Sequence, residues 1–240
     1  MSGDTQSFTL SRRLCAEALG TALLVAAVVG SGIMADGLTE DTALALLCNA
    51  IATGAALVVL ISTFGPISGA HFNPAVSLVF ALKGSLPVRD AGAYAAAQVA
   101  GGAAGTIATH LMFGLSAIEL SETVRTGAGQ WWAEILATFG LVTVIIAAVR
   151  FRVDAIPWLV GLYITAAYWF TASTSLANPA VTAARALTNT FAGIRPLDVP
   201  GFIIAELTGS MLALLLLSWL LQPDPRATVS RRKGLLDGTE

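Results

Sequence analysis

Charged residues are scarce in this chain of 240 residues, because only 12% are Asp, Glu, Lys or Arg. Soluble domains carry about 25%. This shortage excludes a water-facing surface over most of the chain and indicates that lipid is the main solvent. The formal net charge of -2 excludes the basic surface with which proteins bind nucleic acid.

Cysteine is also scarce, since the chain has only Cys15 and Cys48. Both lie in apolar runs, so we expect two buried thiols and no disulfide framework. No group of residues has the spacing of a metal site. The chain also shows no nucleophile paired with a base and no phosphate-binding loop, so an enzyme is not indicated. We expect neither a metal nor an organic cofactor.

Long apolar segments are what the chain does have. About 20 apolar residues cross the hydrocarbon of a bilayer. We expect transmembrane helices at roughly residues 12–34, 43–63, 88–113, 131–150, 156–173 and 200–221. The first of these is longer than the core of a cleaved signal peptide, which has about 7–15 residues, so it counts as a span.

Two shorter apolar segments, 73–82 and 178–188, are too short to cross. Each begins with Asn-Pro, and this pair starts helices because Asn caps the first turn and Pro fits into it. We therefore expect two half-helices that enter the membrane and turn back. The segments before them, 65–72 and 173–177, are then irregular, with carbonyl groups that face a polar lumen. Interfacial helices are the alternative, but these segments carry almost no charge.

The two halves of the chain resemble each other. The segment at 16–21, Ala-Glu-Ala-Leu-Gly-Thr, is echoed at 133–138, and Asn-Pro-Ala-Val occurs at 73–76 and at 178–181. Three spans per half invert the second copy in the membrane. The prediction is an all-α membrane protein with six transmembrane helices and two re-entrant half-helices. It forms one channel domain over 1–240, with repeats at about 10–113 and 131–222 and a cytoplasmic tail at 223–240.

The basic residues predict the orientation of the chain. Ten of the 13 Lys and Arg residues fall on one side of the predicted spans, which makes that side, with both termini, cytoplasmic. The other three, Arg125, Arg185 and Arg195, fall on the outer side.

Two copies of Asn-Pro-Ala form a specific signal when each opens a half-helix. They are Asn73-Pro74-Ala75 and Asn178-Pro179-Ala180. With these motifs and the segment 68–76, Ser-Gly-Ala-His-Phe-Asn-Pro-Ala-Val, the chain resembles the aquaporin (major intrinsic protein) superfamily over about residues 10–222. The resemblance implies a bundle of six tilted spans, a homotetramer and one pore per protomer.

Paired half-helices suit a channel for neutral solutes. Their N-termini carry partial positive charge and meet near the membrane centre, where a cation is disfavoured. Asn73 and Asn178 offer amide donors at the same place. Carbonyl groups of the loop before the first signature are expected to line the pore, from Gly69, Ala70, His71 and Phe72. For His71, a pH-sensing gate is the alternative role.

Three carboxyl groups lie inside predicted spans, at Glu17, Glu134 and Glu206. Glu17 and Glu134 occupy equivalent places in the repeats, so we expect them to accept hydrogen bonds from the two re-entrant loops. A proton relay is the alternative. Glu206 has Gln98 as its counterpart, which favours a scaffold role. His110, late in the third span, is expected to be a packing or interface residue.

The resemblance also implies a selectivity filter. Its positions fall on Thr53, Ser175 and Val181, and in the fifth span on Tyr168 or Ala166, depending on the alignment; we prefer Tyr168. The family nearly always has arginine where this chain has Val181. A filter arginine is a fixed cation with five donors that narrows the pore. We therefore expect a wide, weakly polar ring that admits glycerol-sized and larger neutral solutes.

Arg185 lies one helical turn beyond Val181. It either rises into the outer vestibule and partly replaces the missing charge, or snorkels to the membrane surface.

The segment Tyr168 to Ser175, with valine in the filter, resembles bacterial aquaglyceroporins of arsenic-resistance operons. This resemblance implies passage of arsenite as As(OH)3 and of bulkier uncharged organoarsenicals. The alternatives are a water-selective aquaporin and a proton-coupled secondary transporter.

Overall fold

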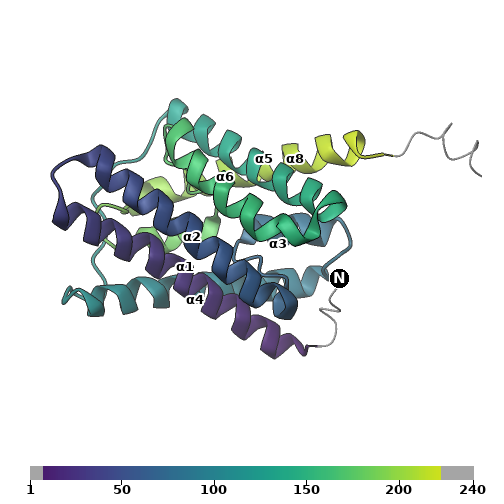
Figure 1. Cartoon of the computed structure of the whole chain (residues 1–240), viewed down its shortest axis with the longest axis horizontal. Helices are drawn as coiled ribbons and strands as arrows, with labels where there is room; N and C mark the ends of the chain where they lie inside the picture. Colours follow the sequence, from purple (N-terminus) through teal and green to yellow (C-terminus); the bar gives the residue numbers. More distant parts are fainter. Residues whose placement is uncertain (1–7, 223–240) are drawn as a thin grey trace, which may run out of the picture.

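The computed structural model describes residues 8–222, so the predicted tail at 223–240 lies outside the described residues. Six long helices run side by side along the long axis (Figure 1). They are α1 (Leu10–Leu38), α2 (Thr42–Ser68), α4 (Val88–Met112), α5 (Ala128–Phe151), α6 (Ile156–Phe170) and α8 (Val199–Leu220). The short elements are α3 (Pro74–Leu82), α7 (Pro179–Arg185) and the 3-10 turns η2 (Val153–Ala155) and η3 (Pro196–Asp198).

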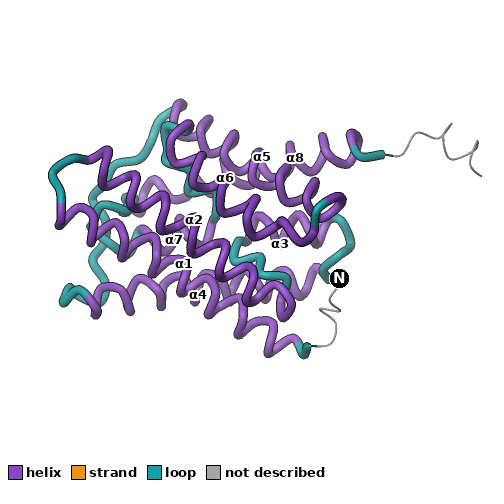
Figure 2. Tube along the Cα trace, viewed as in Figure 1, coloured by secondary structure: helices purple, strands orange, loops and turns teal. Residues whose placement is uncertain are grey.

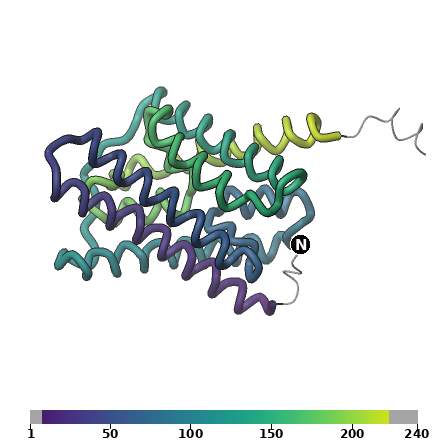
Figure 3. The backbone as a smooth tube through the Cα atoms, in the orientation of Figure 1, coloured from purple at the N-terminus to yellow at the C-terminus, as the bar shows by residue number. Residues whose placement is uncertain are grey.

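The long helices form two groups of three, one from each half of the chain. α1 packs against α2 and α4, while α5 packs against α6 and α8, and contact between α2 and α6 joins the groups. The beginning of α1 and the end of α8 lie at the same end of the bundle (Figure 3). This arrangement matches the predicted all-α fold of two similar halves.

The half-helices α3 and α7 lie within the outline of the bundle (Figure 2). α3 contacts both α4 and α8, and α7 contacts α1, α4 and α8, so each joins the two halves. Asn73 caps α3 by accepting a hydrogen bond from the backbone N–H of Ala75 at 2.9 Å. Asn178 caps α7 in the same way, with the N–H of Ala180 at 3.0 Å. The two Asn-Pro pairs therefore begin helices as the sequence predicts.

Two predicted boundaries were wrong. The segment from 65 was expected to be irregular, but α2 continues through Pro66 to Ser68. The last turn of α2 stays helical because Gly69, at φ 90°, caps the helix. The N–H of Gly69 donates a hydrogen bond to the carbonyl of Gly65 at 3.0 Å. The second half-helix ends at Arg185 and not at 188, because the next two N–H groups bond three residues back and tighten the turn.

Among the residues that the structure describes, five helices are long and apolar enough to cross a membrane, and α4 is not one of them. α4 is rich in small residues because it lies very close to α1. A side chain at Gly101 would overlap the carbonyl of Ala18, and one at Gly105 would overlap the carbonyl of Ala22. Small residues at such spacing let membrane helices approach closely.

The expectation of buried thiols was wrong, since Cys15 and Cys48 are exposed on the surface of the bundle. In a helix that faces lipid, the outer side is as apolar as the inner side. An apolar run therefore does not tell which of its residues are buried.

Candidate functional site: a lumen between the two halves

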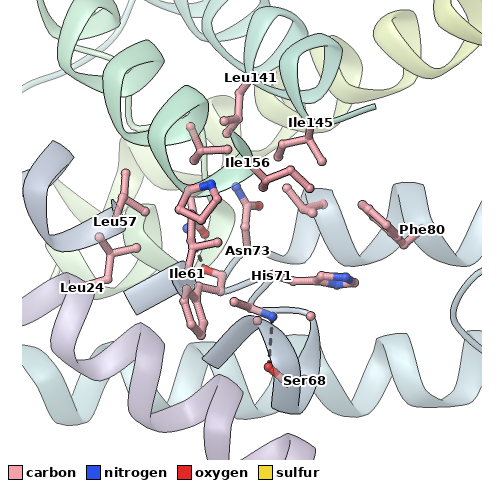
Figure 4. Close-up of a pocket in the computed structure, with 18 of the residues that line it drawn as sticks. Leu24, Leu57, Ile61, Ser68, His71, Asn73, Phe80, Leu141, Ile145 and Ile156 are labelled. Carbon is pink, nitrogen blue, oxygen red and sulfur yellow. Dashed lines mark hydrogen bonds between the residues drawn. The ribbon is translucent and has the colours of Figure 1, made fainter. Parts of the chain in front are cut away.

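A cavity of about 1150 Å³ runs between the two groups of helices. Its apolar wall comes from α1, α2, α5 and α6, and includes Leu57 and Leu141. The re-entrant loops and the starts of the half-helices form the polar wall. Figure 4 shows Leu141 and Ile145 on one side of this cavity and His71 and Ser68 on the other. A lumen with one apolar and one polar wall suits small solutes that have both polar and apolar faces.

The two signature asparagines meet within the bundle and line the cavity. Asn73 donates from Nδ2 to the carbonyl of Ala177 at 2.8 Å. Asn178 donates from Nδ2 to the carbonyl of Phe72, also at 2.8 Å. Each amide nitrogen carries two hydrogens, so one N–H of each asparagine remains for a solute.

The backbone of the two loops follows one pattern. Ala70 and Phe72, three and one residues before Asn73, have φ of 49° and 48°. Ser175 and Ala177, at the same offsets before Asn178, have φ of 54° and 47°. Left-handed conformations at non-glycine residues cost about 1–3 kcal/mol each and persist only where the surroundings fix them.

Glu17 fixes the first loop. Its carboxylate accepts from the backbone N–H groups of His71 at 3.0 Å and Phe72 at 2.7 Å. It also accepts from the hydroxyl of Ser68 at 2.6 Å. Since the N–H groups point to the carboxylate, the loop can turn carbonyl groups toward the lumen.

Glu134 fixes the second loop in the same manner. It accepts from the N–H groups of Leu176 at 2.9 Å and Ala177 at 2.7 Å. Both glutamates are fully buried. These are contacts of the kind that a loop-supporting role requires.

Gln98 and Glu206 make similar contacts in the two halves, since each bonds to a hydroxyl group of a half-helix. Gln98 donates from Nε2 to Glu17 at 2.8 Å and to Ser77 at 3.0 Å. Glu206 accepts from the hydroxyl of Thr182 at 2.5 Å and from the N–H of Asn178 at 3.2 Å. These bonds hold the half-helices to α4 and α8, as expected of a scaffold.

The two histidines have different places. His71 lines the cavity, with Nδ1 3.1 Å from the hydroxyl of Ser77 and its ring against Phe80. His110 is fully buried and joins the end of α4 to two loops, through the carbonyl of Ser116 and the hydroxyl of Thr188. It is thus a packing residue, as the sequence predicts.

The four preferred filter residues all line the cavity: Thr53, Tyr168, Ser175 and Val181. The hydroxyls of Thr53 and Tyr168 lie 3.2 Å apart. Ala166 is exposed on the surface of the bundle, so the geometry favours Tyr168. We call the part of the cavity that these four residues line the outer mouth, following the predicted orientation.

Arg185 also lines the cavity and is only 3% exposed. Its Nε donates to the carbonyl of Ala192. A snorkelling arginine would reach the surface, so that alternative was wrong.

The chain matches the model of the family described as "Major intrinsic protein" over residues 4–152. It is 67% identical over 218 residues to "Aquaglyceroporin AqpS" of Rhizobium meliloti (strain 1021), covering 91% of this chain and 94% of that one. The chain belongs to the major intrinsic protein family.

More distant relatives of this major intrinsic protein include "Aquaporin NIP1-4" of Oryza sativa subsp. japonica. It is 37% identical over 147 residues, or 60% of this chain and 53% of that relative. The solved structure of the aquaglyceroporin from Plasmodium falciparum has a TM-score of 0.66 at 21% identity, covering 87% of this chain and 96% of that one. At this identity the likeness shows the fold alone.

Within residues 8–222 of this major intrinsic protein, no group of three or more His, Cys, Asp or Glu residues has the arrangement of a metal site. One residue near the outer mouth was missed by sequence reasoning. Arg125, in the loop between α4 and α5, donates to the carbonyls of Gly193 at 2.8 Å and Ser173 at 3.3 Å. No sequence motif marks Arg125, because its position depends on contacts between loops that are distant in sequence.

Proposed function

We propose that this protein is a passive channel for small neutral solutes. The proposed solutes are glycerol-like polyols, arsenite as As(OH)3, larger uncharged organoarsenicals and some water. The family is one of membrane channels, and the 67% identical relative is named an aquaglyceroporin.

Val181 is the observation that carries the proposal. It lies at the cavity wall with Thr53 and Tyr168, where a branched apolar side chain replaces a long cationic one. Without a guanidinium, the ring is wider and holds fewer donors for water. A solute with several hydroxyl groups can place its apolar side on Val181 and its oxygens on the loop carbonyls and asparagine amides.

Arg185 partly replaces the missing filter cation in this proposal. Its Nε is held by the carbonyl of Ala192, and within the described residues no protein acceptor bonds to its two Nη groups. Arg185 lines the cavity, which supports the proposal that these groups donate to a solute oxygen at the outer mouth.

The assembly we propose is a homotetramer with one pore per protomer, in the inner (plasma) membrane with both termini cytoplasmic. Large apolar side chains are exposed on the outer surface of the bundle, including Leu23, Ile51 and Leu212. Such a surface fits lipid tails and neighbouring protomers.

Stopped-flow light scattering on proteoliposomes tests the proposed function. Glycerol and arsenite are expected to enter faster than into empty liposomes, at rates that do not change when a proton gradient is imposed. Permeability equal to that of empty liposomes would refute the channel for these solutes. Uptake driven by the gradient would favour a proton-coupled transporter.

A further inference from the structure

Two guanidinium groups near the outer mouth are held by adjacent carbonyls, and of the two Arg185 is the one that lines the cavity. Arg185 donates from Nε to the carbonyl of Ala192, and Arg125 donates from Nε to that of Gly193. The two arginines come from different elements, α7 and the loop between α4 and α5, and meet only through the fold. Successive carbonyls therefore hold the two cations as neighbours.

Further hydrogen bonds hold Arg125 and its backbone in place. Its Nη1 donates to the carbonyl of Ser173, two residues before the filter residue Ser175. Its backbone N–H donates to Asp198 at 2.9 Å, and Asp198 is bound in turn by Arg195 at 2.9 Å. The half-buried side chain of Arg125 is thus held across the loop that precedes the second signature.

The side chain of Arg125 remains positively charged at neutral pH despite its surroundings. Burial, followed by the charge of Arg185, lowers the pKa of Arg125 to about 10, while Glu134 and Tyr168 act in the opposite direction. A pKa of about 10 keeps the group charged at neutral pH. Glu134 is engaged by the N–H groups of the second loop and does not form an ion pair with Arg125 among the described residues.

We propose that Arg125 and Arg185 form a cationic collar outward of Val181, and that Arg125 is a specificity-determining residue that repels cations from a filter without its own arginine. The inference rests on the proposed function, since it assumes that solutes pass Val181. In a wide pore, size does not exclude small cations. The positive ends of the half-helices lie deeper, so the collar gives the outer mouth a barrier of its own.

Charged thiol reagents measure the potential at this place directly. Val181→Cys is made in a background in which the exposed Cys15 and Cys48 are replaced by alanine. Intact cells are treated with methanethiosulfonates that carry a sulfonate, a quaternary ammonium or no charge, and modification rates are read by mass spectrometry. With Arg125 present, the sulfonate is expected to react faster than the ammonium reagent.

Arg125→Gln should lower the ratio of sulfonate to ammonium rates by about tenfold, as expected for loss of one charge at such a distance in a partly solvated mouth. Arg125→Lys keeps the charge but not the guanidinium fork, and should retain most of the ratio. A merely structural role for Arg125 would make both variants alike. Arg150→Gln, which removes an exposed cation in the last turn of α5, at the opposite end of that helix from Arg125, is the matched control and should leave the ratio unchanged.

An unchanged ratio of sulfonate to ammonium rates in Arg125→Gln would refute the proposed cationic collar. Failure of the uncharged reagent to reach the cysteine at position 181 would instead contradict the wide filter of the proposed function. The two failures are therefore distinguishable.

Discussion

Asn73 and Asn178 each donate a hydrogen bond to the carbonyl that immediately precedes the other, both at 2.8 Å. Each asparagine also caps its own half-helix through Oδ1. One side chain thus fixes the start of its own helix and the end of the opposite loop. The two halves are locked together at the point where the half-helix ends meet.

Asn178→Asp should destabilise the protein. The new carboxylate keeps the cap, but it places a second acceptor against the carbonyl of Phe72, which loses its donor. A buried group without its partner costs about 1–3 kcal/mol. Thermal unfolding of the purified protein should therefore begin at a lower temperature.

Asn189→Asp is the matched control, because Asn189 is exposed and its Oδ1 accepts from the N–H of Glu122 at 3.0 Å. That acceptor survives the change, so the unfolding temperature should stay near that of the wild type. Equal effects of the two substitutions would argue against a stabilising role for the hydrogen bond between Asn178 and the carbonyl of Phe72.

Glu134→Gln should destabilise the second loop. Both oxygens of Glu134 accept backbone N–H groups, and an amide nitrogen in place of one oxygen leaves Leu176 or Ala177 without an acceptor. The expected loss is about 1–3 kcal/mol in the free energy of unfolding. It is measured by thermal or denaturant unfolding in detergent.

Glu206→Gln should be tolerated, in contrast. The equivalent residue of the first half is Gln98, and Glu206 Oε2 is buried without a hydrogen-bond partner. A glutamine keeps an oxygen for Thr182 and removes a second carboxyl group from the region of Glu134. A larger loss for Glu206→Gln than for Glu134→Gln would show that the equivalence of the halves is misleading.

Gly101→Ala should separate α1 from α4, since the added methyl group would overlap the carbonyl of Ala18. Overpacking of this kind typically costs about 1–3 kcal/mol. Gly92→Ala, on the same helix, meets nothing within 4 Å and should be neutral or stabilising. Unfolding temperatures of the two variants check this, and similar values would contradict the close helix contact.

Much of the fold could be predicted from the sequence, because its signals are local. Apolar length predicted the long helices, and Asn-Pro predicted α3 and α7. The repeat predicted that Glu17 and Glu134 hold the loops. The end of α2 was missed because a left-handed Gly69 closes a helix that runs past Pro66.

The outer mouth was harder to predict, because its contacts join loops that are distant in sequence. Val181 and Tyr168 were predicted as filter residues from the resemblance to the aquaporin superfamily. No sequence motif marks Arg125, and its place depends on Gly193 and Asp198. The sequence alone also could not distinguish the exposed thiols of Cys15 and Cys48 from buried ones, since lipid and protein interior are equally apolar.

Val181 determines the breadth of the filter in this account, so its replacement is the most informative change. Val181→Arg restores a long cation with five donors and narrows the ring. Val181→Leu, which adds volume without charge, is the control that separates size from electrostatics.

The deciding measurement is the ratio of glycerol to water permeability in proteoliposomes, by stopped-flow light scattering. Val181→Arg should lower this ratio by about tenfold, equivalent to about 1.4 kcal/mol, with a smaller effect from Val181→Leu. A wild-type protein that passes water but no glycerol, or an unchanged ratio in Val181→Arg, would contradict the wide neutral-solute filter.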